Sequence, residues 1–108
     1  MKLPKTIQIL NYTFDIKRSE DYYGHFEFSD KDNKGKPTIT IANDKERSDS
    51  IICEILIHEV LEIILELLRV RYTAPSDDSY EFHYTHKEHD TVSKILARAL
   101  MPMFKEVK

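Results

Sequence analysis

Three side chains near the middle of the sequence have the types and the spacing of metal ligands. They are His58, Glu59 and Glu62, in the segment His-Glu-Val-Leu-Glu. Residues four apart lie on one face of a helix, so His58 and Glu62 can point at one ion while Glu59 lies about 100° round the helix axis. Imidazole and carboxylate groups are both zinc ligands. The segment therefore predicts a zinc site with His58 and Glu62 as two of its ligands.

Glu59 follows the first ligand, the position of the general base in the related pattern His-Glu-x-x-His. We expect its carboxylate to accept a proton from an attacking water and to pass that proton to a leaving amine. Glu62 stands where that pattern has its second His, and a carboxylate there is still a legitimate ligand. The predicted chemistry is hydrolysis of a carbonyl compound, such as a peptide, by water activated at the metal.

A third ligand has to come from another element, and the segment 84–90 (Tyr-Thr-His-Lys-Glu-His-Asp) concentrates the candidates. This segment opens a predicted helix whose inward residues are Val92, Leu96, Ala99 and Met103. One turn further back, the same stripe reaches His89, with His86 beside it. We expect His86 to be the third ligand, because a residue of the first turn lies near the mouth of a site between two helices. His89 and then Asp90 are the alternatives.

A simpler interpretation is that His58 and Glu62 belong to a solvated polar stripe. On a helical wheel they share an arc with three more charged residues of the helix, namely Glu54, Glu66 and Arg69. The same arc also contains three large apolar residues: Ile51, Ile55 and Leu65. Because these apolar side chains need cover, we expect another element to pack over this face and to leave a cleft beside the ligands.

The elements that must position these residues follow from the hydrophobic pattern. Alternation predicts strands at 6–10 and 13–17, which form either a short hairpin or one bulged strand. It also predicts an antiparallel pair formed by 23–28 and 38–42. Within the last strand, Ile39 and Ile41 face the core. The run 29–37 between the paired strands is dense in turn formers and predicts a surface loop.

Two helices are predicted in the second half. The first has Ser48 as its N-cap and continues to about Val70, without Gly or Pro. The segments 72–73 and 80–84 flank a turn-rich run and predict a small second hairpin. Thr85 and Glu88 then form a capping box that opens the last helix, which we expect Pro102 to end. The predicted fold class is α+β: a small antiparallel sheet packed against a long central helix and a C-terminal helix.

Length, composition and charge limit the function classes. A chain of 108 residues, 41% hydrophobic and 32% charged, predicts one globular domain spanning 1–108. A net charge of −3 without a basic stripe disfavours nucleic-acid binding. No apolar run predicts a signal peptide or a membrane span, so we expect a cytoplasmic protein. The single cysteine, Cys53, lies in an apolar helical pattern and predicts an inert thiol rather than a nucleophile.

The order of elements and the segment Ile57-His58-Glu59-Val60-Leu61 resemble the small phage and prophage proteins with a minimal zincin-like fold, described as metallopeptidases. The resemblance covers nearly the whole chain. It implies that His58 is the first metal ligand, that Glu59 is the catalytic base, and that the third ligand is an acidic residue or His at the start of the last helix. It also implies a protein or peptide substrate and a bacterial or phage-infected host cell.

Two functions remain open on the sequence alone. In the first, the protein is a zinc-dependent metallopeptidase that uses Glu59 as its base. In the second, the zincin-like fold is kept without catalysis, and the domain is a phage or prophage structural or interaction protein with or without a metal. Both functions stay open because Glu62, which occupies the place of the second His, allows a metal to bind but departs from the catalytic pattern.

Overall fold

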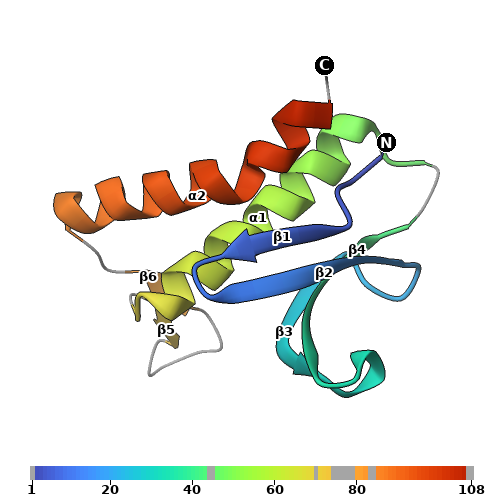
Figure 1. The fold of residues 1–108 in the computed structure, drawn as a ribbon, viewed down its shortest axis with the longest axis horizontal. Helices are drawn as coiled ribbons and strands as arrows, with labels where there is room; N and C mark the ends of the chain where they lie inside the picture. The colour runs from blue at the N-terminus through green and yellow to red at the C-terminus, as the bar shows by residue number, and fades with distance from the viewer. Residues whose placement is uncertain (1, 44–45, 70, 74–79, 83–84, 107–108) are drawn as a thin grey trace.

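The computed structural model describes residues 2–43, 46–69, 71–73, 80–82 and 85–106 (Figure 1). Four strands come first: β1 (Thr6–Ile9), β2 (Tyr12–Ser19), β3 (Gly24–Asp30) and β4 (Lys36–Ala42), with a short 3-10 helix, η1 (Lys31–Asn33), before β4. They are followed by α1 (Asp49–Leu67), β5 (Arg71–Thr73), β6 (Tyr80–Phe82) and α2 (His86–Glu106). The predicted α+β class is confirmed. The predicted turn at 74–79 and the residues His83 and Tyr84 lie outside the described residues.

The four-stranded sheet is mixed, with the order β1-β2-β4-β3. The β1–β2 hairpin and the antiparallel β3–β4 pair are both confirmed. The prediction of a purely antiparallel sheet is wrong, because β2 and β4 pair in parallel, with Ile16 opposite Ile39. The physical reason is burial: β4 is buried from Thr38 to Ala42 and takes a central position, whereas the more exposed β3 lies at the edge.

Helix α1 begins as predicted. The Ser48 hydroxyl accepts a hydrogen bond from the backbone N–H of Ile51, and Asp49 occupies the first turn, near the positive end of the helix dipole. The helix ends at Leu67, earlier than predicted, and Arg69 turns the chain with a φ of 59°. The predicted last residue, Val70, lies outside the described residues.

Helix α2 begins with the predicted capping box. The Thr85 backbone N–H donates to the Glu88 carboxylate at 2.9 Å, and the Glu88 backbone N–H donates to the Thr85 hydroxyl at 3.2 Å. The prediction that Pro102 ends this helix is wrong, because α2 continues to Glu106. A proline removes only one hydrogen bond of the ladder, and the partly buried Met103 still packs against the core beyond it.

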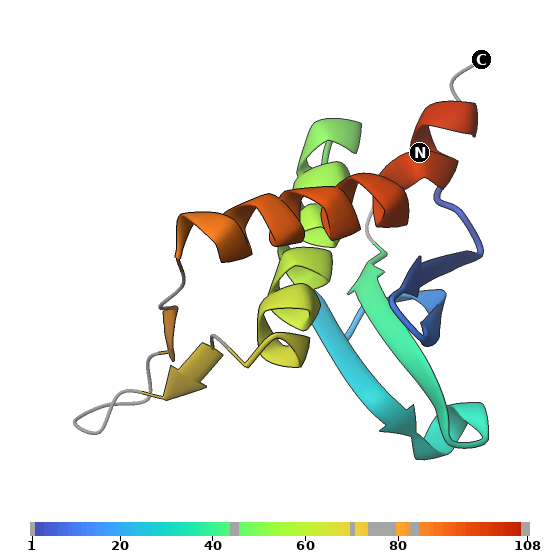
Figure 2. The same ribbon diagram turned by 60° about the vertical axis from the view of Figure 1, so that its left-hand side comes forward.

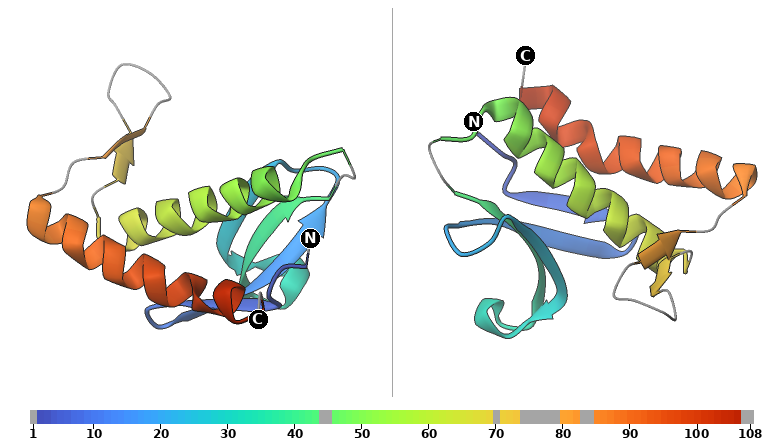
Figure 3. Two further views of the ribbon diagram at one scale, coloured as in Figure 1. Left: turned by 90° about the horizontal axis from the view of Figure 1, so that it is seen from above. Right: turned by 180° about the vertical axis from the view of Figure 1, so that it is seen from behind.

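One core fills the space between the sheet and the two helices. Figure 2 shows α1 and α2 on the same side of the sheet, and Figure 3 shows the β5–β6 hairpin projecting away from these layers. Ile39 and Ile41 face the core, as predicted. The core also includes Ile7, Ile9, Phe14, Leu56, Val60, Ile63, Ile64, Val92 and Ala99. None of the described helices is long and apolar enough to cross a membrane.

Candidate metal centre

Helix α1 brings His58, Glu59 and Glu62 together. The Nε2 atom of His58 lies 3.3 Å from a carboxylate oxygen of Glu62 and 4.0 Å from a carboxylate oxygen of Glu59. One ligand atom from each of the three side chains lies within 4.8 Å of the other two. The group can hold a metal ion. The spacing read from the sequence therefore places the two predicted ligands on one face, and it places Glu59 beside them.

The three side chains differ in exposure. The His58 side chain is 67% exposed, Glu62 is 21% exposed and Glu59 is only 8% exposed. Glu59 is the one charged residue that is buried in the described part of the chain. Because a buried carboxylate needs charged or hydrogen-bonding partners, its position suits a ligand or a base better than a solvated surface group. The group is thus open to solvent at His58 and seated in the protein at Glu59.

The face of α1 that carries the group is covered in part. Ile55 and Leu65, two of the three apolar residues expected to need cover, are buried at 2% and 5% exposure, while Ile51 stays exposed. Strand β3 lies over Ile55 and Glu59, and Gly24 is the residue of β3 at this contact. Strand β3 therefore shelters the Glu59 side of the group, while His58 and the stripe residues Glu54 and Glu66 stay exposed.

Helix α2 does not contribute to this group. His86, at the first turn of α2, is 89% exposed, and its Nδ1 atom lies 3.7 Å from a carboxylate oxygen of Asp90. His89 is also exposed, with its ring centroid 6.5 Å from that of His86. Among the described residues, the only group with three possible ligands is the one on α1. His86, with His89 and Asp90 as alternatives, stays a prediction for the third ligand, and Glu59 is the third donor that the geometry supplies.

The inward stripe of α2 explains this outcome. Val92 and Ala99 are buried, as the helical spacing predicts. His89, one turn before Val92, is exposed. The reason is that the first turn of α2 extends away from the sheet (Figure 2). The length of helix that extends beyond the core is a property of the tertiary structure, so the sequence periodicity could not show where the burial of this stripe ends.

The donor set consists of one imidazole nitrogen and carboxylate oxygens. These atoms suit a divalent cation of intermediate hardness, and zinc accepts all of them. A zinc ion would need ligand atoms at ~2.0–2.2 Å from it. The residues present therefore fit a metal in number and type, with coordination positions left over for water or substrate.

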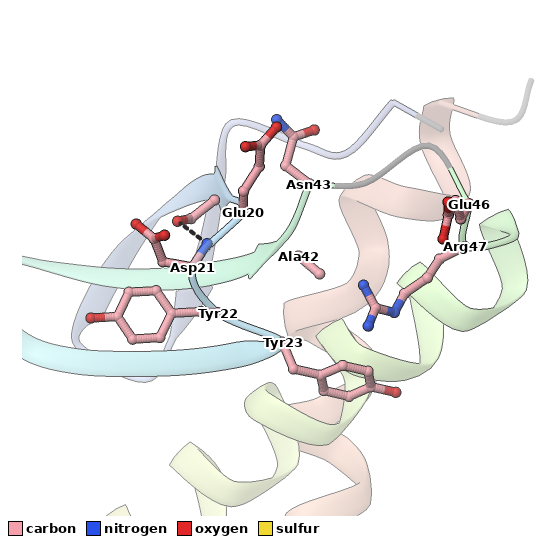
Figure 4. Close-up of a pocket in the computed structure, with 9 residues that line it drawn as sticks. Glu20, Asp21, Tyr22, Tyr23, Ala42, Asn43, Glu46 and Arg47 are labelled. Atoms are coloured by element: carbon pink, nitrogen blue, oxygen red, sulfur yellow. Dashed lines mark hydrogen bonds between the residues drawn. The ribbon is translucent and has the colours of Figure 1, made fainter.

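A separate hollow lies elsewhere in the described part of the chain. Its volume is about 590 Å³, and it is lined by residues 19–23, Ala42, Asn43, Glu46 and Arg47, at the carboxyl ends of the parallel strands β2 and β4 (Figure 4). The Arg47 guanidinium lies 4.9 Å from the centre of the Tyr23 ring. None of the three grouped side chains lines this hollow, so we place the candidate chemistry at the group and not here.

The single cysteine does not add a nucleophile. Burial, together with the nearby Asp49 carboxylate, raises the pKa of the Cys53 thiol above its ordinary value. A raised pKa keeps the thiol protonated at neutral pH, and the thiolate is the nucleophilic form. This agrees with the expectation of an inert thiol.

Comparisons with protein-family models, with curated proteins and with solved structures find no match for this chain. The zincin-like fold is therefore a proposal for this chain, and the geometry of His58, Glu59 and Glu62 is what supports it.

Proposed function

We propose that the protein is a zinc-dependent hydrolase of the metallopeptidase type, with His58 and Glu62 as metal ligands and Glu59 as general base. The observation that carries the proposal is the convergence of three ligand atoms on α1, one of them from a buried carboxylate. A solvated helix face would explain His58 and Glu62, but it would not explain Glu59 turned into the protein. The fold would then be a minimal zincin-like one.

The metal and the grouped side chains have distinct roles in this proposal. When bound, zinc supplies a Lewis acid that polarises a carbonyl group and lowers the pKa of a water molecule towards ~7. Glu59 removes the proton from the attacking water and delivers it to the leaving amine. Burial against β3 holds the Glu59 carboxylate in one place, which is what a base requires to act on a positioned water.

A peptide is the substrate class that the surroundings favour. Strand β3 is an edge strand of the sheet, and no further strand pairs with it among the described residues. An extended peptide can add to such an edge through main-chain hydrogen bonds. Because Gly24 of β3 lies against Glu59, a peptide along this edge would pass close to the proposed base.

Metal analysis tests the first half of the proposal. Protein purified without a His-tag and reconstituted with zinc should hold roughly one equivalent, and His58→Ala should lose it, because removing the only imidazole of the group leaves carboxylates alone. The exposed Glu54, one turn before His58 on the same helix, gives a matched control: Glu54→Gln should keep the metal. Binding of less than about a tenth of an equivalent by the wild type would refute the metal site.

Hydrolysis of a set of unstructured peptides tests the second half. At saturating zinc, Glu59→Gln should still bind the metal, though more weakly because a negative charge beside the ion is lost, and it should lower the hydrolysis rate by roughly 10²–10⁴-fold, the usual contribution of a general base. Glu54→Gln should leave the rate unchanged. If the metal-loaded wild type hydrolyses nothing, or if Glu59→Gln hydrolyses as fast as the wild type, the non-catalytic phage-type interaction protein becomes the better proposal.

A further inference from the structure

Gly24, at the start of β3, lies where the edge strand meets the middle of α1. A Cβ atom added at this position would lie 2.8 Å from the Cγ2 atom of Ile55 and 2.9 Å from a carboxylate oxygen of Glu59. Real Cβ atoms essentially never make contacts this short. Any other residue at position 24 would therefore displace the strand, the isoleucine or the carboxylate.

The backbone does not explain this glycine. Gly35 has a φ of 79°, a conformation that favours glycine, whereas Gly24 has no such positive φ. At Gly35 the added Cβ would lie 3.7 Å from its nearest neighbour, the Ser29 hydroxyl oxygen, which is an ordinary contact. The two positions thus require glycine for different reasons: the backbone conformation at Gly35, and space for neighbouring side chains at Gly24.

Of the two neighbours of Gly24, Glu59 is the one that would yield. Ile55 is buried at 2% exposure, and a β-branched side chain in a helix has essentially one rotamer. The Glu59 contact is made by the far end of a flexible side chain, which can swing away at lower cost. A methyl group at position 24 would displace the carboxylate from its present position beside His58 and Glu62, or would move α1 off the strand.

We propose that Gly24 is a positioning residue of the metal centre: its missing side chain lets β3 press against α1 and seat the Glu59 carboxylate beside His58 and Glu62. The inference rests on the proposed function, because the group that Gly24 would position is the proposed metal centre. Gly24 has no side chain that could bind the metal, and it acts on the metal centre through Glu59.

Zinc affinity, measured by competition with a chromophoric chelator, tests this role. Gly24→Ala should weaken zinc binding by roughly tenfold or more, because the displaced Glu59 carboxylate no longer places its negative charge beside the ion, and changes in groups just outside the ligand set usually have effects of this size. It should also alter the visible absorption spectrum of the Co²⁺-substituted protein. Gly35→Ala is the matched control: it should lower the unfolding midpoint, because of its positive φ, and leave both metal readouts unchanged.

A double-variant comparison shows whether the effect passes through Glu59. In a Glu59→Ala background the carboxylate is gone, so Gly24→Ala should weaken zinc binding no further. If Gly24→Ala does not fold, Ile55→Ala removes the other close contact. The pair Gly24→Ala/Ile55→Ala against Ile55→Ala then gives the same comparison. Unchanged zinc affinity in Gly24→Ala would overturn the inference and leave the proposed function standing.

Failure of the proposed function would give a different result, because the wild type itself would then bind no zinc. If the wild type binds no zinc, urea unfolding of the metal-free variants still tests the packing. Positions 24 and 59 should then show a non-additive effect on stability, because Gly24→Ala costs less once the Glu59 carboxylate is removed. Additive effects would overturn the seating of Glu59 by Gly24, whatever the protein binds.

Discussion

At the scale of single residues, Asp30 shows how a polar side chain organises the helix-free face of the sheet. Its carboxylate accepts a hydrogen bond from the Thr38 hydroxyl at 2.9 Å and another from the Asp32 backbone N–H at 3.0 Å. The Lys17 ammonium lies 3.6 Å away. The hydrogen bond from Thr38, followed by that from Asp32 and the charge of Lys17, holds the pKa of Asp30 below its ordinary value of 3.8.

Because the pKa of Asp30 is lowered, part of the free energy of unfolding depends on pH. A carboxyl group with a lower pKa in the folded protein stabilises fully above its unfolded-state pKa, and this contribution disappears as the pH falls through the folded-state pKa. Thr38→Val removes the main cause of the shift. The difference in urea midpoint between wild type and Thr38→Val should therefore be largest at neutral pH and should shrink below about pH 3.8. An equal difference at pH 7 and pH 2.5 would contradict this account.

At the scale of elements, α2 depends on its first turn. Thr85 and Glu88 satisfy two backbone N–H groups reciprocally, in a part of the helix that extends away from the sheet and has little tertiary support. Local hydrogen bonds have to stabilise this end, because the buried residues of α2 begin at Val92. The capping box could be identified from the sequence because its two residues are neighbours and its geometry is local.

Thr85→Ala should lower the free energy of unfolding by about 1 kcal/mol, the usual cost of losing an N-cap side chain. Thr91 supplies the comparison, since its hydroxyl donates to the Lys87 carbonyl in the helix interior, a bond that contributes little to helix stability. Thr91→Ala should be neutral or slightly stabilising, because alanine is the better helix former. Equal losses in urea unfolding for the two variants would rule out the capping explanation.

At the scale of the whole molecule, the candidate metal centre joins two parts of the fold. His58, Glu59 and Glu62 belong to α1, but the burial of Glu59 depends on β3, which is held in place by β4. The unfolded chain cannot present this arrangement. Metal binding to the folded state alone has to stabilise the protein against unfolding.

Zinc at about a hundred times its dissociation constant should therefore add about 2.7 kcal/mol to the stability. For a domain of this size that gain raises the melting temperature by roughly 10 °C or more. Thermal unfolding followed by circular dichroism, with and without zinc, measures the shift, and a chelator should reverse it. His58→Ala should show no shift, and a similar shift in that variant would point to zinc binding elsewhere on the surface.

Several parts of the fold could be predicted from the sequence. The strand positions, the Ser48 and Thr85 caps, and the inward Ile39 and Ile41 follow from alternation and from local hydrogen-bonding residues. The parallel pairing of β2 with β4 was not predictable in this way, because it depends on which strand gains most from a central, buried position. The continuation of α2 past Pro102 likewise depends on packing beyond the proline.

The candidate site was likewise predictable only in part. The spacing of His58 and Glu62 determines that they share a helix face, since a helix repeats every 3.6 residues wherever it lies in a fold. Only the tertiary structure decided that Glu59 is the buried member, that Gly24 makes room for its carboxylate, and that His86 and His89 lie outside the group. Periodicity fixes directions round one helix axis, whereas burial and contact between elements depend on the distance between segments far apart in the chain.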